Sequence, residues 1–227
     1  MVVPPRHSLV WLHAQGWRAV LAQTPAHVRA QVIRWRDANW PLTVRRRDAD
    51  SVDDELCVGI ALPPQDGNKV RLPYRVEFSA VAKYQPTLSL SEIVSGLPLS
   101  WRDAALQLHG SAQHAGLSVQ VYGSAALQSI TGLQYLHDAS DLDLLLQPTT
   151  LQQLDDCVRL FFQFDQQLPL DGEIVFGTSA AVAAREWRNA AQQDGGFRVL
   201  AKQAAGVALM RKDALISLLD RQPCLQT

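Results

Sequence analysis

The sequence is poor in cysteine and has no excess of charge of either sign. Its 227 residues include three cysteines, Cys57, Cys157 and Cys224, which are widely spaced and form no Cys-x-x-Cys pair. This pattern indicates neither a disulfide framework nor a zinc site, and reduced thiols predict a cytoplasmic protein. The formal net charge is -1, so we expect no general attraction to nucleic acid or to anionic membranes. Any phosphate binding must come from a local cluster.

Long apolar runs are also missing. The first apolar stretch, residues 9–12, is shorter than the roughly 7 residues of the shortest signal-peptide hydrophobic segments. No later run approaches the ~18 apolar residues of a membrane span, so we expect no membrane association. Hydrophobic residues make up 47% and charged residues 19% of the chain, as in ordinary globular proteins. The length suits two small domains.

The first part of the chain, residues 1–86, predicts a small α+β domain that is rich in strands. Short strands are expected at residues 9–12, 19–22, 42–46, 57–62, 69–72 and 76–78, and a helix at residues 26–37. Residues 63–68 combine Pro and Gly and therefore predict a turn. A Pro-containing segment at residues 84–87 marks the expected domain boundary.

The second part, residues 87–227, alternates helices and strands. Helices are expected at residues 91–95, 100–115, 150–164, 179–187 and 212–220, the second of them with Ser100 as N-cap and Gly116 as C-cap. Strands are expected at residues 119–122, 141–146, 172–176, 197–202 and 206–210. Such alternation predicts a layered α/β or α+β architecture.

Two aspartates separated by one residue begin an apolar run in this second part. Side chains alternate along a strand, so Asp141 and Asp143 are expected on one face while the leucines between and after them enter the core. Mg²⁺ takes carboxylate oxygens, keeps several waters and completes its shell with substrate phosphates. The pair therefore predicts Mg²⁺ held beside phosphate. The plainer alternative is a solvent-facing pair at a strand start.

A Gly-Ser pair upstream offers a place for that phosphate. Gly123 and Ser124 lie between an apolar strand and the expected start of a short helix. Glycine lets the backbone approach a ligand closely, and the first N–H groups of a helix favour an anion. Taken alone, the pair is weak evidence and is better explained by a tight turn followed by a helix cap.

Together, the Gly-Ser pair, Thr131-Gly132-Leu133 and the Asp-x-Asp motif resemble the nucleotidyltransferase superfamily. The resemblance implies a polymerase-β-like domain, with a mixed sheet flanked by helices and a third acidic residue on a later strand. Asp171 and Glu173 share a face of the expected next strand, and we prefer Asp171 as the third acid, with Glu173 as the alternative. The implied chemistry is metal-assisted nucleotidyl or phosphoryl transfer. A plain turn at Asp171-Gly172 remains an alternative.

A closer resemblance covers nearly the whole chain. Residues 6–11, 41–46 and 59–63, together with the Gly-Ser and Asp-x-Asp motifs, are similar to the phosphoribosyl-dephospho-CoA transferase family of the malonate decarboxylase system. This resemblance implies transfer of the 2'-(5''-phosphoribosyl)-3'-dephospho-CoA group from a triphosphoribosyl-dephospho-CoA donor. The implied acceptor is a serine of the malonate decarboxylase acyl carrier protein, and diphosphate is released. Two alternatives are adenylylation with ATP and a non-enzymatic domain that binds nucleotide or carrier protein.

Three basic side chains are candidate contacts for the donor. Arg45 and Arg46 lie at the end of an expected strand, on opposite faces, so at most one is expected to touch substrate. Arginine forks match phosphate oxygens, although charged strand ends more commonly protect a sheet edge from aggregation. Lys202 also ends an expected strand, and an exposed lysine without a ligand is its simpler interpretation.

Overall fold

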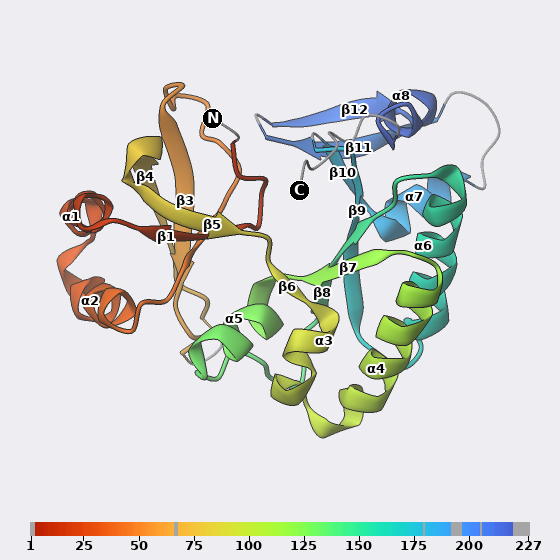
Figure 1. Cartoon of the computed structure of the whole chain (residues 1–227), viewed down its shortest axis with the longest axis horizontal. Helices are drawn as coiled ribbons and strands as arrows, with labels where there is room; N and C mark the ends of the chain where they lie inside the picture. The colour runs from red at the N-terminus through yellow and green to blue at the C-terminus, as the bar shows by residue number, and fades with distance from the viewer. Residues whose placement is uncertain (1–2, 66–67, 179, 192–196, 205, 220–227) are drawn as a thin grey trace. The chain divides into compact units, whose positions relative to one another are not determined.

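The computed structural model describes residues 3–65, 68–178, 180–191, 197–204 and 206–219, which form two compact units. One unit contains Met1–Thr87, Ile130–Tyr135 and Ala204–Gly206, and the other contains Leu88–Ser129, Leu136–Gln203 and Val207–Thr227, each as far as it is described. The fold is mixed α/β, with an antiparallel sheet in the first unit and a mixed sheet in the second (Figure 1). Within the described ranges, no helix has the length and hydropathy needed to cross a membrane.

The first unit is built on a five-stranded antiparallel sheet in the order β4-β3-β2-β1-β5. Its strands are β1 (Leu9–Leu12), β2 (Leu42–Val44), β3 (Glu55–Ala61), β4 (Arg71–Glu77) and β5 (Val81–Gln85). Its helices are α1 (Ala14–Gln23) and α2 (Arg29–Asp37), with the short 3-10 helices η1 (Ala26–Val28) and η2 (Phe78–Ala80). Because β1 pairs with both β2 and β5, the first strand lies inside the sheet.

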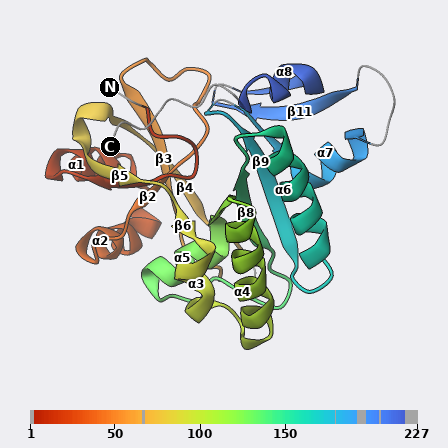
Figure 2. The same ribbon diagram turned by 45° about the vertical axis from the view of Figure 1, so that its right-hand side comes forward.

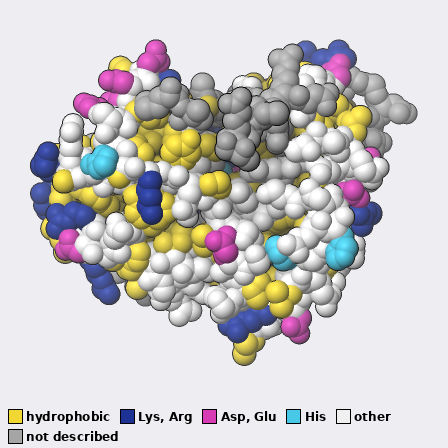
Figure 3. All heavy atoms as spheres, viewed as in Figure 1, with side chains coloured by type: hydrophobic (Ala, Val, Ile, Leu, Met, Phe, Trp, Pro, Cys, Tyr) yellow, Lys and Arg dark blue, Asp and Glu magenta, His cyan; other side chains and the backbone are white. Residues whose placement is uncertain are grey.

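The two helices of the first unit turn their apolar side chains inward. Trp35 of α2 is buried, and its indole N–H donates a 3.0 Å hydrogen bond to the carbonyl of Pro41. The exposed side chains of the two helices include the basic residues Arg18, Arg29 and Arg34, and Figure 3 shows basic side chains over this part of the surface. This division of side chains is typical of amphipathic surface helices.

The strand predicted at residues 19–22 is wrong, because these residues lie within α1. The buried residues of α1 are Gly16, Trp17 and Val20, and their spacing follows a helix rather than a strand. The strands predicted at residues 69–72 and 76–78 are parts of a single strand, β4, and β5 was not predicted.

Two later segments of the chain join the first unit through specific hydrogen bonds. The buried Tyr135 donates from its hydroxyl to the carbonyl of Ala61 at 2.8 Å. The N–H of Arg47 donates to the carbonyl of Ala204 at 3.0 Å. This unit is therefore assembled from parts of the chain that are far apart in sequence.

The second unit is built on a seven-stranded sheet in the order β12-β11-β10-β9-β8-β7-β6. Its strands are β6 (Leu88–Ser89), β7 (Ser118–Val121), β8 (Leu142–Gln147), β9 (Leu170–Phe176), β10 (Ala180–Ala183), β11 (Arg198–Gln203) and β12 (Val207–Arg211). Its helices are α3 (Leu90–Ile93), η3 (Val94–Gly96), α4 (Leu99–His114), α5 (Gly123–Thr131), α6 (Leu151–Phe164), α7 (Ala184–Ala191) and α8 (Lys212–Ile216). Strands β8 and β9 are parallel, and the other paired strands are antiparallel.

One face of this sheet carries the core of the second unit. Figures 1 and 2 show α4 and α6 side by side over the sheet, and Leu142, Leu144 and Leu146 of β8 are buried with them. A side chain at Gly172 of β9 would overlap the ring of Phe161 of α6, so glycine permits close packing there. The opposite face of the same strands carries Asp143, Asp171 and Glu173 together with the apolar Leu145 and Val175.

Two predictions about helices in this unit are wrong. Residues 180–183 form strand β10 rather than the start of a helix, and Ser179 lies outside the described residues. The alanines of this segment favour a helix locally, but pairing with β9 and β11 overrides that preference. Helix α4 begins at Leu99 with Pro98 as its N-cap residue, two residues before the predicted cap Ser100, and its C-cap is Ala115 rather than Gly116.

Candidate active site

Two carboxylates lie opposite each other near the starts of two neighbouring central strands of the seven-stranded sheet. Strands β8 and β9 run in parallel, and Asp143 lies directly opposite Asp171 in their register. Asp141 comes immediately before β8, not within it as predicted, and is exposed. We refer to Asp141, Asp143 and Asp171 as the acidic edge. The predicted candidates Asp143 and Asp171 are thus brought together by strand pairing, since neighbouring strands lie only about 5 Å apart.

Gly123 brings a helix N-terminus to the acidic edge. Strand β7 is antiparallel to β8, so its end meets the start of β8, and the N–H of Tyr122 donates to the carbonyl of Asp143 at 3.1 Å. Gly123 begins α5 with φ +68°. A Cβ built there would overlap the carboxylate of Asp143, at 2.9 Å from its Cγ. Ser124 follows in the first turn, where backbone N–H groups have no intrahelical acceptor.

Replacing Gly123 with alanine is expected to damage the site in two ways. The positive φ costs about 1–2 kcal/mol of stability for a residue with a Cβ, and the methyl group must displace the Asp143 carboxylate. Gly132 is a matched control because it also has φ +68° but no atom within 4 Å of an added Cβ. We expect urea unfolding to show similar losses for Gly123→Ala and Gly132→Ala, while only Gly123→Ala lowers transfer activity. Equal activities of the two variants would contradict this prediction.

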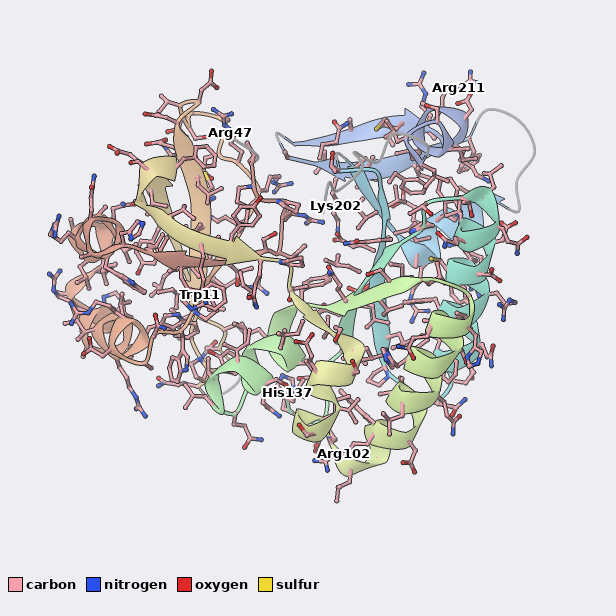
Figure 4. The ribbon with its side chains drawn as sticks, viewed as in Figure 1. Trp11, Arg47, Arg102, His137, Lys202 and Arg211 are labelled. Carbon is pink, nitrogen blue, oxygen red and sulfur yellow. The ribbon has the colours of Figure 1, made fainter. Side chains whose placement is uncertain are left out.

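Glu173, the alternative third acid, is buried and bound to Lys202. The two residues share the sheet face of Asp171, and Lys202 Nζ lies 2.6 Å from Glu173 Oε1 (Figure 4). On the intervening strand β10, Ala181 pairs with Lys202 and Ala183 pairs with Glu173. Because both alanine side chains are small, the lysine side chain has room to reach across β10 to Glu173. The side chain of Glu173 is only 4% exposed, against 39% for Lys202. The buried carboxylate therefore already has a cationic partner, whereas Asp171 is exposed.

Arg45 and Arg46 lie in the first unit, just after β2. The guanidinium of Arg45 donates to both carboxylate oxygens of Asp48, at 2.5 and 2.6 Å, and to the carbonyl of Val58 at 3.2 Å. Together with Arg75, Arg45 holds the pKa of Asp48 well below its usual range. The fork of Arg45 is thus occupied by this carboxylate, while the side chain of Arg46 is exposed.

The residues of the acidic edge fit a magnesium ion that arrives with phosphate. Within the described ranges, no three His, Cys, Asp or Glu side chains form a ready-made metal cluster. Mg²⁺ is usually held by only one or two carboxylates and by substrate phosphates. The carboxylate donors of Asp143 and Asp171, which lie opposite each other on neighbouring strands, match this requirement.

Arg185, in the first turn of α7, was not identified from the sequence. Its side chain binds Asp165 and donates to the carbonyl of Leu170, next to Asp171. Asp165 raises the pKa of Arg185, and the negative charges of Asp171 and Asp141 add to this effect. The expected helix at residues 179–187 placed Arg185 in the middle of a helix. Recognition of β10 would have placed it at the end of a strand beside β9.

Comparison with known proteins covers both parts of the chain. Residues 5–86 match the phosphoribosyl-dephospho-CoA transferase MdcG N-terminal domain, and residues 88–213 match the C-terminal domain of the same family. No solved structure matches the chain.

Curated relatives extend this match over almost the full length. The phosphoribosyl-dephospho-CoA transferase of Xanthomonas campestris pv. campestris (strain 8004) is 37% identical over 212 residues, covering 92% of this chain and 95% of the relative. The Bradyrhizobium diazoefficiens protein of the same name is 33% identical over 217 residues, covering 94% and 93%. The Pseudomonas aeruginosa protein is 31% identical over 200 residues, covering 84% and 89%. The family predicted from the motifs is confirmed: the chain belongs to the phosphoribosyl-dephospho-CoA transferase MdcG family.

Proposed function

We propose that the acidic edge is where this chain carries out the reaction of its family. The chain is an enzyme, a phosphoribosyl-dephospho-CoA transferase that attaches the prosthetic group to the acyl carrier protein of malonate decarboxylase. The observation that carries the assignment of the site is the alignment of Asp143 with Asp171, with the helix start at Gly123 packed against Asp143. Carboxylates and free backbone N–H groups together suit a substrate that carries several phosphates.

The second unit is proposed to be a polymerase-β-like nucleotidyltransferase domain. Support comes from the order of its parts: β7, the Gly-Ser turn, helix α5, then the Asp-x-Asp motif at the start of β8 and a further acid on β9. A mixed sheet with helices on one face accompanies them. The family match rests on the sequence, and this topology is consistent with it.

Asp141, Asp143 and Asp171 would hold Mg²⁺ in this site. When bound, the metal would stabilise the charge that develops on the attacking and leaving oxygens. We propose Asp171 rather than Glu173 as the third acid, because Glu173 is buried against Lys202 and Asp171 is exposed at the edge. Asp141, which precedes β8, and Asp143, its second residue, would supply the other carboxylate oxygens.

The remaining groups orient the donor and accept a proton. The first N–H groups of α5, at Gly123 and Ser124, are proposed to bind the donor's phosphates. A serine hydroxyl of the carrier attacks the α-phosphorus, so that an O–P bond forms and the bond to diphosphate breaks. The serine proton passes to one of the aspartates. From the first unit we keep Arg46, whose side chain is exposed, ahead of Arg45 as a donor contact.

Mass spectrometry of the carrier protein tests this function. The enzyme is incubated with the acyl carrier protein, Mg²⁺ and either the triphosphoribosyl-dephospho-CoA donor or ATP. We expect the carrier to gain the mass of the phosphoribosyl-dephospho-CoA group with the first donor and to remain unchanged with ATP. An AMP adduct would instead support adenylylation. We also propose a cytoplasmic enzyme, in keeping with the free, buried thiols of Cys57 and Cys157.

A further inference from the structure

Arg185 joins two parts of the second unit that are distant in sequence. Its guanidinium binds both carboxylate oxygens of Asp165, at 2.9 and 2.5 Å, and the carbonyl of Leu170 at 3.1 Å. Asp165 is the C-cap residue of α6, and its side chain is mostly buried. A bidentate arginine–carboxylate pair fixes direction as well as distance. Arg185 therefore links the first turn of α7 to the connection between α6 and β9.

That connection sets the position of both strands that carry the acidic edge. The carbonyl of Pro169 accepts a 2.8 Å hydrogen bond from the N–H of Leu142, the residue between Asp141 and Asp143. Leu170 pairs in register with Leu142 and directly precedes Asp171. A shift of residues 165–170 would thus be transmitted to β8 and β9 at the same time.

We propose that Arg185 is a positioning residue for the acidic edge. By binding Asp165 and Leu170 it holds the connection in the one arrangement that places Asp171 opposite Asp143. The inference deepens the proposed function and rests on it. Groups that orient metal ligands without touching the metal typically contribute about 10- to 100-fold to metal affinity or activity.

The pair can be tested with three variants: Arg185→Lys, Asp165→Asn and the double variant. Arg185→Lys keeps the positive charge but cannot form the two parallel hydrogen bonds of a guanidinium group. It therefore distinguishes the effect of hydrogen-bond geometry from the effect of charge. We expect each variant to lower kcat by about 10- to 100-fold, without a change in KM for the carrier. The double variant is expected to lose no more than either single one, because all three break the same contact.

Metal binding provides a readout that does not depend on turnover. Mn²⁺ binding in the presence of inorganic diphosphate is followed by electron paramagnetic resonance, and melting temperature is recorded for each variant. We expect Arg185→Lys and Asp165→Asn to weaken Mn²⁺ binding by about 10-fold or more while melting close to the wild type. Arg211→Lys is the matched control, because Arg211 also binds an aspartate through two hydrogen bonds, at 3.0 and 2.8 Å, but on β12 at the sheet's outer edge (Figure 4).

Three results would decide against the inference. Wild-type kcat and Mn²⁺ affinity in both single variants would overturn it. Multiplying losses in the double variant would show that Arg185 does not act through Asp165, and would also overturn it. If the wild-type protein binds no Mn²⁺ with diphosphate and Asp143→Asn keeps full activity, the proposed site itself is wrong, and the role of Arg185 falls with it.

Discussion

Replacing Asp143 with asparagine is expected to lower the rate of transfer by about 10³-fold or more, because a metal site of this kind supplies several kcal/mol and each 1.4 kcal/mol is a factor of ten. Asp143 combines three relations: it lies opposite Asp171, its carboxylate occupies the space left by Gly123, and its carbonyl accepts the N–H of Tyr122. Asparagine keeps the shape and the backbone contact but removes the negative charge. The measurement is the single-turnover rate of carrier modification, followed by mass.

The loss should occur without unfolding. Asp143 is only partly buried, and its neighbours Leu142 and Leu144 supply the core contacts of the strand. We therefore expect a melting temperature near that of the wild type. Asp141→Ala is expected to abolish transfer in the same way. Near-normal turnover in either variant would refute the metal assignment.

Replacing Lys202 with methionine is expected to lower the free energy of unfolding by about 3 kcal/mol, at the lower end of the range for breaking a buried ion pair. The reason is that Glu173, with 4% of its side chain exposed, would lose the ammonium 2.6 Å away. We expect a loss at the lower end of this range because the Lys202 side chain is itself 39% exposed, so solvent weakens its interaction with Glu173. Urea unfolding measures the change.

Two further variants distinguish this effect from a general loss of surface charge. Combining Lys202→Met with Glu173→Gln removes both charges and should recover most of the lost stability, since the buried carboxylate that the ammonium stabilised is then neutral. Arg211→Met breaks an ion pair whose partners are both about 60% exposed, and should cost less than about 1 kcal/mol. Equal losses for Lys202→Met and Arg211→Met would contradict the buried-pair account.

The motifs of the candidate site could be recognised in the sequence, whereas several elements of the fold around them could not. The Gly-Ser pair and the Asp-x-Asp motif are local patterns that indicated the superfamily. Residues 6–11, 41–46 and 59–63 narrowed the resemblance to the family that the comparisons confirm. The choice between Asp171 and Glu173 could not be made from sequence, because the two share a face of one strand. The two acids differ in that Glu173 is paired with Lys202, which β11 places beside it across β10, whereas Asp171 is exposed.

The errors in the predicted fold have a common physical origin. Residues 19–22 and 180–183 are short segments rich in alanine and other small apolar residues, and their local preference is weak. Tertiary packing decided both, since residues 19–22 lie within α1 with Val20 buried, and residues 180–183 form a strand between β9 and β11. Arg185 was missed because its partner Asp165 lies in a different element, and only the pairing of β9 with β10 brings the two together.

The most direct test of the acidic edge is a crystal of the enzyme grown with the triphosphate donor and Mn²⁺, with anomalous scattering used to locate the metal. We predict anomalous peaks within coordinating distance of the Asp143 and Asp171 carboxylates, with donor phosphate completing the shell and the diphosphate near the start of α5. Clear density for the donor with no metal at these carboxylates, or with the metal bound elsewhere, would contradict the assignment of this edge as the transfer site.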